Sequence, residues 1–413
     1  MKLARLSALT AAMTLISATH ANDLINDGTL DLHLRNYYLN SQADNNSNIQ
    51  WSQAFSVDFS SGFYKNIIGF DLGVHYALKL RGDIPAGDGT PGLLPVDANG
   101  KADSYGKTSY AIKVNLADMG MAKYGRMFID TPLLNNNYSR SLPGLTEAFY
   151  AEGSFQGVNM YGIWATKSND RISSGFMDLM VNGKKEAVKV LGGGYDFGNG
   201  IAVNLAAGQQ DDVARKYYAD LGYAMGLQGV SIESSLQYGQ SSARGYSKSN
   251  PGNGTDEPQK SWGLSVSAGM HQATFGISYQ RLNQSGATYA NNWSGQGGMN
   301  DTEYFGPNSL MISDFNGDGQ KSWGLNAGYD FTGMIDGLSI DLTYVKGGVD
   351  SKDNTKDTDE NEYNLTAVYA LPQIENLSVS AQYAKNTKKD KFSGTKETEK
   401  QIRLIVKYDM SVF

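Results

Sequence analysis

Hydrophobic and polar residues alternate along most of this chain. In the segment 68–81 (IGFDLGVHYALKLR), every even-numbered residue from Ile68 to Leu80 is apolar, and the odd-numbered positions hold glycine, alanine, aspartate, histidine, lysine or arginine. A β-strand has a side-chain period of two, so one face of such a segment is apolar and the other is polar. The same alternation returns in 30–35, 230–238, 322–331 and 402–409. The pattern predicts a protein built from β-strands that have two different surroundings.

Eighteen segments are expected to form strands. They lie near residues 28–39, 51–60, 66–81, 105–117, 121–128, 146–154, 158–167, 186–197, 200–208, 213–224, 229–239, 260–269, 272–282, 321–331, 337–347, 361–371, 377–386 and 398–412. Short connections such as Gln156-Gly157 alternate with long polar ones, with one exception near 209–212, and the long ones include 40–50, 82–104, 129–145 and 283–320. This layout is typical of an outer-membrane barrel with periplasmic turns and extracellular loops. We predict an all-β fold, a transmembrane antiparallel β-barrel of about 18 strands.

The sheet is expected to close because its backbone groups need hydrogen-bond partners within the membrane. Lipid offers no hydrogen-bond partners to N–H and C=O groups, so a sheet spans a membrane only when it closes and leaves no edge. A barrel of about 18 strands encloses a water-filled lumen, which accepts the polar face of each strand. A soluble sandwich, solenoid or propeller would also alternate, but the sequence shows neither a fixed-length repeat nor interdomain linkers.

The N-terminal segment has the features of a targeting signal. Lys2 and Arg5 precede an uncharged, mostly apolar run from Leu6 to Ala18, and Thr19-His20-Ala21 offers a cleavage site. About 13 apolar residues are too few for a membrane-spanning helix. Residues 1–21 are therefore expected to be a secretory signal peptide, and residues 22–413 a single barrel domain in the bacterial outer membrane.

Composition excludes several other classes of protein. The 413 residues contain no cysteine, which excludes a disulfide scaffold, zinc–thiolate sites and cysteine catalysis. A net charge of −7 argues against a nucleic-acid binder. No G-x-S-x-G motif follows a strand, so we expect no enzyme, and no cofactor is implied.

One loop shows a weak metal signal. Asp314, Asn316 and Asp318 match the first half of a calcium-binding loop, but position 12 of that loop is Leu325 where a glutamate is required. A tight turn explains the same residues. We expect no metal site, with this loop as the weak candidate.

Several stretches resemble the OprD family of substrate-selective outer-membrane porins, which includes chitoporin-like members. They are LRNYYLN at 34–40, SRSLPG at 139–144, residues 313–346 (SDFNGDGQKSWGLNAGYDFTGMIDGLSIDLTYVK), ENEYNLTAVYALPQIENLSVSAQYAK at 360–385 and QIRLIVKYD at 401–409. The resemblance implies 18 strands, inward-folded loops that narrow the pore, and a row of basic side chains that guides acidic solutes. The C-terminal segment departs from the family, since Asp409 stands where proline is common.

The matching motifs carry Arg35, Arg140 and Arg403, and the alternation places Arg35 and Arg403 on the polar face. The first and last strands must pair to close the barrel. We expect Asp31 near the level of Lys407 and Arg35 near Arg403, with His33 between them. Other inward cations are expected at Lys79, Arg81 and Lys113. Charges of both signs would orient and select solutes, or they would merely neutralise a polar wall.

The connection 129–145 is the expected constriction loop, with Asp130 and Arg140 as its charged pair. The alternative is a loop packed on the wall. Tyr37 and Tyr161 on the polar face are weaker candidates for contacts with sugar rings.

The predicted function is passive, charge-selective diffusion of small polar solutes, either amino acids and small carboxylates or chito-oligosaccharides. The alternative is an adhesin or phage receptor that uses the long loops. The expected partners are these solutes, outer-membrane lipid or lipopolysaccharide, and the barrel insertion machinery, with monomer and trimer both open.

Overall fold

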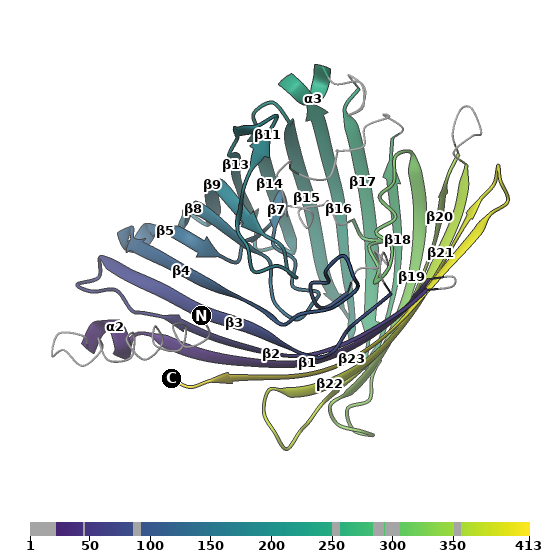
Figure 1. Ribbon diagram of the computed structural model, residues 1–413, viewed down its shortest axis with the longest axis horizontal. Coiled ribbons are helices and arrows are strands. Elements are labelled where there is room, and N and C mark those ends of the chain that lie inside the picture. The colour runs from purple at the N-terminus through teal and green to yellow at the C-terminus, as the bar shows by residue number, and fades with distance from the viewer. Residues whose placement is uncertain are drawn as a thin grey trace.

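The computed structural model describes residues 22–43, 46–85, 92–249, 257–283, 293, 306–350 and 357–413. The predicted signal peptide, residues 1–21, lies outside the described residues. Within them, eighteen long strands follow one another around a closed antiparallel barrel, and the last pairs with the first (Figure 1). The barrel strands are β1 (Thr29–Ala43), β2 (Asn46–Ser60), β3 (Ile68–Arg81), β4 (Tyr105–Asn115), β5 (Gly120–Met127), β8 (Leu145–Phe155), β9 (Val158–Asn169), β13 (Val188–Asp196), β14 (Ile201–Gln210), β15 (Ala214–Leu227), β16 (Val230–Ala243), β17 (Gln259–Met270), β18 (Ala273–Leu282), β19 (Gln320–Asp330), β20 (Leu338–Val349), β21 (Thr358–Ala370), β22 (Leu377–Asp390) and β23 (Lys396–Ser411).

The connections contain further short elements. They are β6 (Asp130–Thr131), β7 (Leu134–Asn135), β10 (Met177–Asp178), β11 (Met180–Val181) and β12 (Lys184–Lys185), with the helices α2 (Asn22–Asn26), η2 (Ala117–Met119) and α3 (Gly245–Ser249). The sequence pattern did not predict these elements. None of the helices in the described part of the chain has the length and hydrophobicity that a membrane-spanning helix needs.

The predicted fold class and all eighteen strands are confirmed, but the long connection expected at 40–50 is not. The strands β1 and β2 continue their pairing up to Ala43 and Asn46, so the expected loop at 40–50 is almost entirely strand. The outer parts of both strands are polar on both faces, as at Asn40, Ser41 and Gln42. The alternation stops there although the ladder of hydrogen bonds continues.

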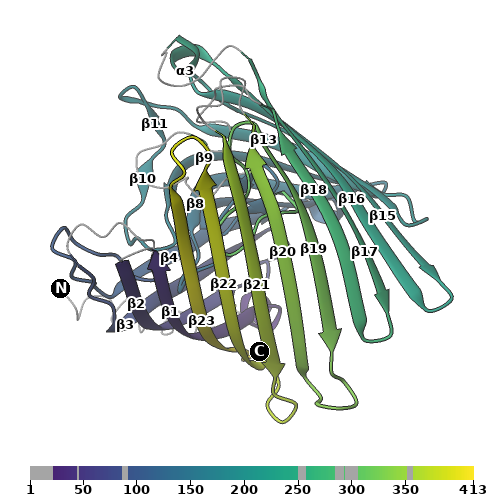
Figure 2. The ribbon, with the colours of Figure 1, turned by 90° about the vertical axis from the view of Figure 1, so that its right-hand side faces the viewer.

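The two faces of each strand meet different surroundings. On β3, Leu72, Val74 and Tyr76 are 41%, 41% and 45% exposed on the outside, whereas His75 and Ala77 on the other face are 5% and 0% exposed. The outward row is apolar and contacts hydrocarbon, and the inward row packs against the contents of the barrel. Figure 2 shows β15 to β23 side by side along one side of the wall.

The short turns use positive backbone angles. Gln156-Gly157 and Gln228-Gly229 each connect two strands directly, with φ of 50° and 81° in the first and 49° and 83° in the second. Two consecutive positive φ values match the right-handed twist of a hairpin, and glycine adopts them without strain.

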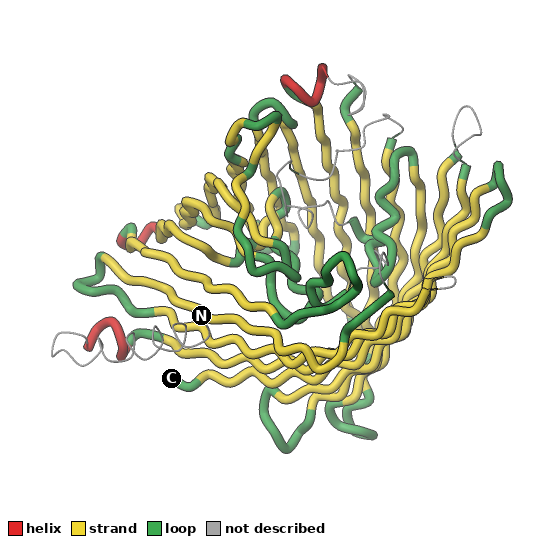
Figure 3. Tube along the Cα trace, in the orientation of Figure 1, coloured by secondary structure: helices red, strands yellow, loops and turns green. Residues whose placement is uncertain are grey.

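The interior of the barrel is partly filled. One apolar cluster joins Leu93, Leu94 and Leu142 from two loops to inward residues of β1 to β4, including Tyr37 and Ala77. A second cluster joins Ile129, Leu133, Leu134 and Trp293 to the inner wall of β8, β9, β13 and β14. Figure 3 shows loop segments, in green, within the space that the strands enclose. These clusters hold the loops inside the lumen.

Candidate functional site

Several connections at the long-loop end of the barrel bind its inner wall, and three of them contact the predicted site residues. We call residues 82–104 the first inward loop, residues 128–144 the second and residues 283–319 the third. The first is described at 82–85 and 92–104, and the third at 283, 293 and 306–319. Together they determine which wall residues can meet a solute.

The second inward loop is fastened to β1 and β2. The Arg35 guanidinium donates to the carbonyl oxygens of Tyr138, at 3.1 Å, and of Arg140. The central carbon of this guanidinium lies 4.2 Å from the centre of the Tyr138 ring. The Ser52 and Ser141 hydroxyls are 2.6 Å apart, which adds a second attachment. Arg35 therefore positions the loop and also places a positive charge beside it.

The predicted constriction loop thus does enter the lumen, but its two charged residues do not pair. Asp130 accepts a hydrogen bond from the Asn135 side chain, 2.5 Å away within the β6–β7 hairpin. The Arg140 Nε donates to the Gly92 carbonyl over 3.1 Å, which joins the second inward loop to the first. No ion pair between Asp130 and Arg140 occurs among the described residues.

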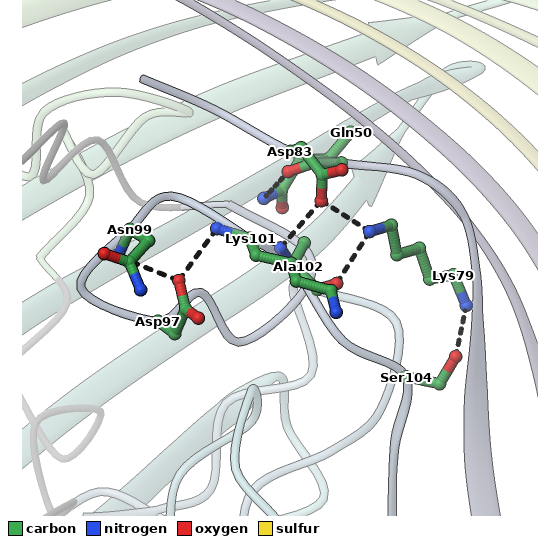
Figure 4. A network of polar contacts seen from close by, with 9 residues as sticks. Gln50, Lys79, Asp83, Asp97, Asn99, Lys101, Ala102 and Ser104 are labelled. Carbon is green, nitrogen blue, oxygen red and sulfur yellow. Dashed lines mark hydrogen bonds and ion pairs between the residues drawn. The ribbon is translucent and has the colours of Figure 1, made fainter. Parts of the chain in front are cut away.

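A polar network anchors the first inward loop (Figure 4). The Lys79 ammonium lies 2.5 Å from an Asp83 carboxylate oxygen and donates to the Ala102 carbonyl at 2.7 Å. The Gln50 side-chain oxygen accepts from the backbone N–H groups of Leu93 and Leu94, at 2.5 and 2.9 Å. The Lys79 ammonium holds the pKa of the Asp83 carboxyl below its usual range. Lys79 faces inward as expected, with its ammonium engaged by this loop.

The third inward loop is bound to β21 and β23, on the other side of the β1–β23 pair from the second inward loop. The buried Glu362 carboxylate of β21 accepts from the N–H groups of Ile312 and Ser313, at 3.0 and 2.9 Å. The Arg403 guanidinium donates to the Met311 carbonyl at 2.7 Å and to the Gln401 side chain. Arg403 is 7% exposed, so it holds this loop instead of projecting freely into the pore.

The seam between β1 and β23 differs from the predicted register. Arg35 lies opposite Lys407, His33 opposite Asp409 and Asp31 opposite Ser411. The expected pairs of Asp31 with Lys407 and Arg35 with Arg403 are therefore wrong by four residues. A shift of four keeps every side chain on its face, so hydrophobic alternation alone does not distinguish the two registers.

The correct register separates the charges along the lumen. Lys407, half-buried on the inner face, makes no ion pair among the described residues, and its neighbour across the seam is the cation Arg35. Two residues nearer the periplasm, the His33 Nδ1 and the Asp409 carboxylate are 2.7 Å apart. Asp31 lies opposite Asp58 on β2. A cationic level beside the second inward loop is thus followed by a more acidic level below it.

A further set of charged residues, on β3, β4 and β5, lies near the periplasmic end of the barrel. The Lys113 ammonium is 2.9 Å from one oxygen of Asp71 and the Lys123 ammonium is 2.8 Å from the other. Lys113 also donates to the Ser60 hydroxyl at 2.6 Å. Lys113 faces inward as predicted, and it shares the Asp71 carboxylate with Lys123.

Arg81 does not face inward. The register between β2 and β3 shifts between Trp51 and Ser52, and Arg81 then lies opposite Trp51. Trp51 is 41% exposed on the outside of the barrel, and directly opposite residues share a face of the sheet. The bulge changes the side on which the alternation places Arg81.

No cluster of three or more histidine, aspartate or glutamate side chains that could hold a metal ion occurs in the described part of the chain. In the weak candidate loop, the Asp314 carboxylate accepts a hydrogen bond from Ser309, and the Gly317 N–H donates to Gln320. These contacts are those of a folded turn.

Sequence reasoning missed several of the anchors, among them Gln50, Glu362 and Lys107. Gln50 and Glu362 are both 0% exposed and both accept N–H groups of loops distant in the chain. Glu360 and Glu362 stand two apart on a strand, which is a visible signal of inward acidic residues. Nothing in the alternation pointed to Gln50, because it lies in the polar end of β2.

Comparison with known proteins identifies the family to which the chain belongs. A family model described as an outer membrane porin of the OprD family matches residues 22–412. The chain belongs to the OprD family. It is therefore an outer-membrane porin, and porins are channels rather than enzymes, which confirms the resemblance noted in the sequence.

The relatives cover nearly the whole chain. Porin D of Pseudomonas aeruginosa is 26% identical over 421 residues, which cover 95% of this chain and 93% of the relative. The porin-like protein GalP of Pseudomonas putida is 25% identical over 408 residues, covering 95% and 94%. Among solved structures, Pseudomonas aeruginosa OpdK with vanillate superposes with a TM-score of 0.80 at 24% identity, covering 94% of this chain and 100% of that one. This structure shares the barrel fold with this chain.

Proposed function

We propose that the barrel is a passive channel for small solutes that carry a carboxylate, including amino acids. The observation that carries this proposal is the pairing of Arg35 with Lys407 across the seam, beside the second inward loop. Two cations on the inner face of a narrow aqueous path in a low-dielectric wall attract anions and raise their local concentration.

The charges below this level support the same proposal. Asp409, Asp31 and Asp58 lie on the periplasmic side of Arg35 and Lys407. Strand residues two apart are separated by about 7 Å, which is within the reach of a small zwitterion. Its carboxylate would contact the cationic level while its ammonium contacts the acidic one.

A sugar path has less support. Tyr37 is only 1% exposed, and its hydroxyl donates to the Ser139 carbonyl at 3.4 Å. Tyr161 packs against the apolar cluster of the inner wall. The Tyr37 ring is therefore unavailable for stacking on a chito-oligosaccharide, and the Tyr161 ring is half-buried.

The receptor alternative also has less support. The described parts of the first and third inward loops are bound to Gln50, Glu362 and Arg403 on the inner wall. An adhesin requires these connections to be displayed outside. Their attachment inside the barrel favours a channel.

Planar-bilayer recordings of the purified protein test the proposal. We expect an ion conductance with anion preference, and a concentration-dependent reduction of chloride current by benzoate and glutamate. Chitohexaose at the same concentrations is expected to leave the current unchanged. Block by chitohexaose without any effect of benzoate or glutamate would contradict the proposal, and absence of conductance would favour the receptor.

A further inference from the structure

Four cations lie on the outside of the barrel, one on each of four consecutive strands at the long-loop end. They are Lys260 of β17, Arg281 of β18, Lys321 of β19 and Lys346 of β20, and all four are exposed. Figure 2 shows β17 to β20 next to one another on one side of the wall. These residues belong to the outward rows of their strands, so they face the surroundings of the barrel and not the lumen.

An aromatic residue lies two positions toward the membrane from each cation. These residues are Trp262, Tyr279, Trp323 and Tyr344. Trp262, Tyr279 and Trp323 are 48%, 42% and 44% exposed. Farther along the same rows, Leu325 and Leu342 are 48% and 50% exposed. Along these rows the outer surface therefore changes from aliphatic to aromatic to cationic side chains. The surrounding lipid changes in the same order, from acyl chains to the membrane interface to the headgroups.

The positive charges are packed together without compensation. Arg281 lies directly opposite Lys321 across the β18–β19 pair, and Lys346 lies opposite Trp323. Like charges directly opposite each other on a sheet are destabilising. Among the described residues, none of the four cationic side chains makes an ion pair.

Another part of the same rim is built differently. There the Lys189 ammonium lies 2.9 Å from Asp211, and the Lys185 ammonium lies 2.6 Å from Asp178. These cations have carboxylate partners within the chain. Lack of an acidic partner is thus not common to every exposed lysine at this end of the barrel.

A groove of about 230 Å³ runs across this surface, lined by Tyr279, Lys321, Trp323 and Lys346 among others. The lining also includes Lys391, Asp350 and Asp359, and the Lys391 ammonium is 3.2 Å from both carboxylates, so three lysines and two acids leave the groove with a net charge of +1. The groove joins an aromatic floor to two free ammonium groups. A phosphorylated sugar fits this chemistry, since phosphate pairs with cations and a sugar ring packs on an aromatic face.

We propose that the β17–β20 surface binds the phosphorylated glycolipid of the outer leaflet through its phosphate groups. The occupant is a lipid because the cations adjoin the apolar band that contacts acyl chains. Phosphate oxygens between Arg281 and Lys321 remove the repulsion between these two side chains. The glycolipid thus forms part of the surroundings in which the barrel is most stable.

The test is binding of bisphosphorylated lipid A to the full mature barrel in detergent, followed by native mass spectrometry and by tryptophan fluorescence. We expect saturable binding that weakens about tenfold to thirtyfold in the double variant Arg281→Gln/Lys321→Gln, because each interfacial cation makes a modest contribution. The matched control is Lys185→Gln/Lys189→Gln, which removes two exposed cations that already have acidic partners. The control is expected to bind like the wild type.

Two further arms distinguish the sources of phosphate and guard against misfolding. Dephosphorylated lipid A is expected to bind weakly to all proteins, and inorganic phosphate is expected to compete poorly with lipid A. Resistance of the unheated barrel to SDS confirms that each variant is folded. Equal loss in the control variant, unchanged binding in the Arg281 and Lys321 variant, or equal binding of the dephosphorylated lipid would overturn the proposal. Full competition by inorganic phosphate would assign the surface to a soluble anion instead.

Discussion

Arg35 of β1 lies directly opposite Lys407 of β23 across the seam that closes the barrel. The two side chains face the lumen, but their surroundings differ. Arg35 is bound to the carbonyls of Tyr138 and Arg140, whereas Lys407 has no ion-pair partner among the described residues. One cation therefore mainly positions a loop, and the other is available to a passing solute.

Lys407→Gln separates these two roles. Because the Lys407 side chain makes no hydrogen bond or ion pair with a loop in the described structure, we expect unchanged conductance but a twofold to fivefold loss of anion preference, about the effect of one unit charge in a focused field. Reversal potentials in a KCl gradient measure this preference. Lys400→Gln, on the exposed outward face of the same strand, is the control and should leave the reversal potential unchanged.

Arg35 should respond differently to two substitutions. Arg35→Lys keeps the charge but cannot bind both carbonyls as the guanidinium does, so we expect retained anion preference with larger fluctuations of the single-channel current. Arg35→Ala removes charge and anchor, with a cost of about 1.5–3 kcal/mol for the lost charged hydrogen bonds. Its expected result is higher conductance and weaker anion preference. Identical recordings from both variants would show that Arg35 does not hold the second inward loop.

The buried carboxylate of Glu362 should control the third inward loop. Glu362→Ala leaves the N–H groups of Ile312 and Ser313 without their acceptor. The loop is expected to detach, with a shift of about tenfold or more in its equilibrium. Limited proteolysis near residue 312 measures this release. Asp359→Asn, on the outward face of the same strand, is the control, and equal protease sensitivity of both variants would contradict the assignment.

The first inward loop should be sensitive to acid. The hydrogen bond from Lys79 lowers the pKa of Asp83, so the anchoring is fully present above the ordinary carboxyl pKa and is lost as the pH falls through the lowered value. We expect acid-induced current fluctuations in the wild type only below about pH 4. In Lys79→Gln the pKa returns toward its ordinary value, so the transition should move to higher pH. A transition at the same pH in both proteins would exclude this ion pair as the acid-sensitive contact.

Sequence predicted the barrel well because lipid and water act on alternate residues of the same strand. All eighteen strands follow from rows such as Leu72, Val74 and Tyr76 against Gly73, His75 and Ala77. The same rule correctly placed Arg35, Arg403 and Lys113 on the inside. It failed for Arg81, because a register shift between Trp51 and Ser52 changes the face without any change in composition.

The site was less predictable because it depends on register and on long-range contacts. The alternation fixes a strand pairing only up to an even shift, so the seam was misplaced by four residues at Arg35. The contacts of Arg403 with Met311 and of Gln50 with Leu93 join residues far apart in the chain. Their partners are backbone groups, which have no signature in the sequence. The family resemblance supplied the inward loops, and the structure supplied their anchors.

The most direct test of the proposed anion path uses the natural absence of cysteine from the chain. Lys407→Cys is recorded in a planar bilayer while an anionic or a cationic methanethiosulfonate reagent is added, with the outward-facing Val406→Cys as control. The account predicts that both reagents reduce the Lys407→Cys current, that the anionic reagent reacts faster, and that Val406→Cys is unaffected. Faster reaction of the cationic reagent, or no reaction at residue 407, would contradict it.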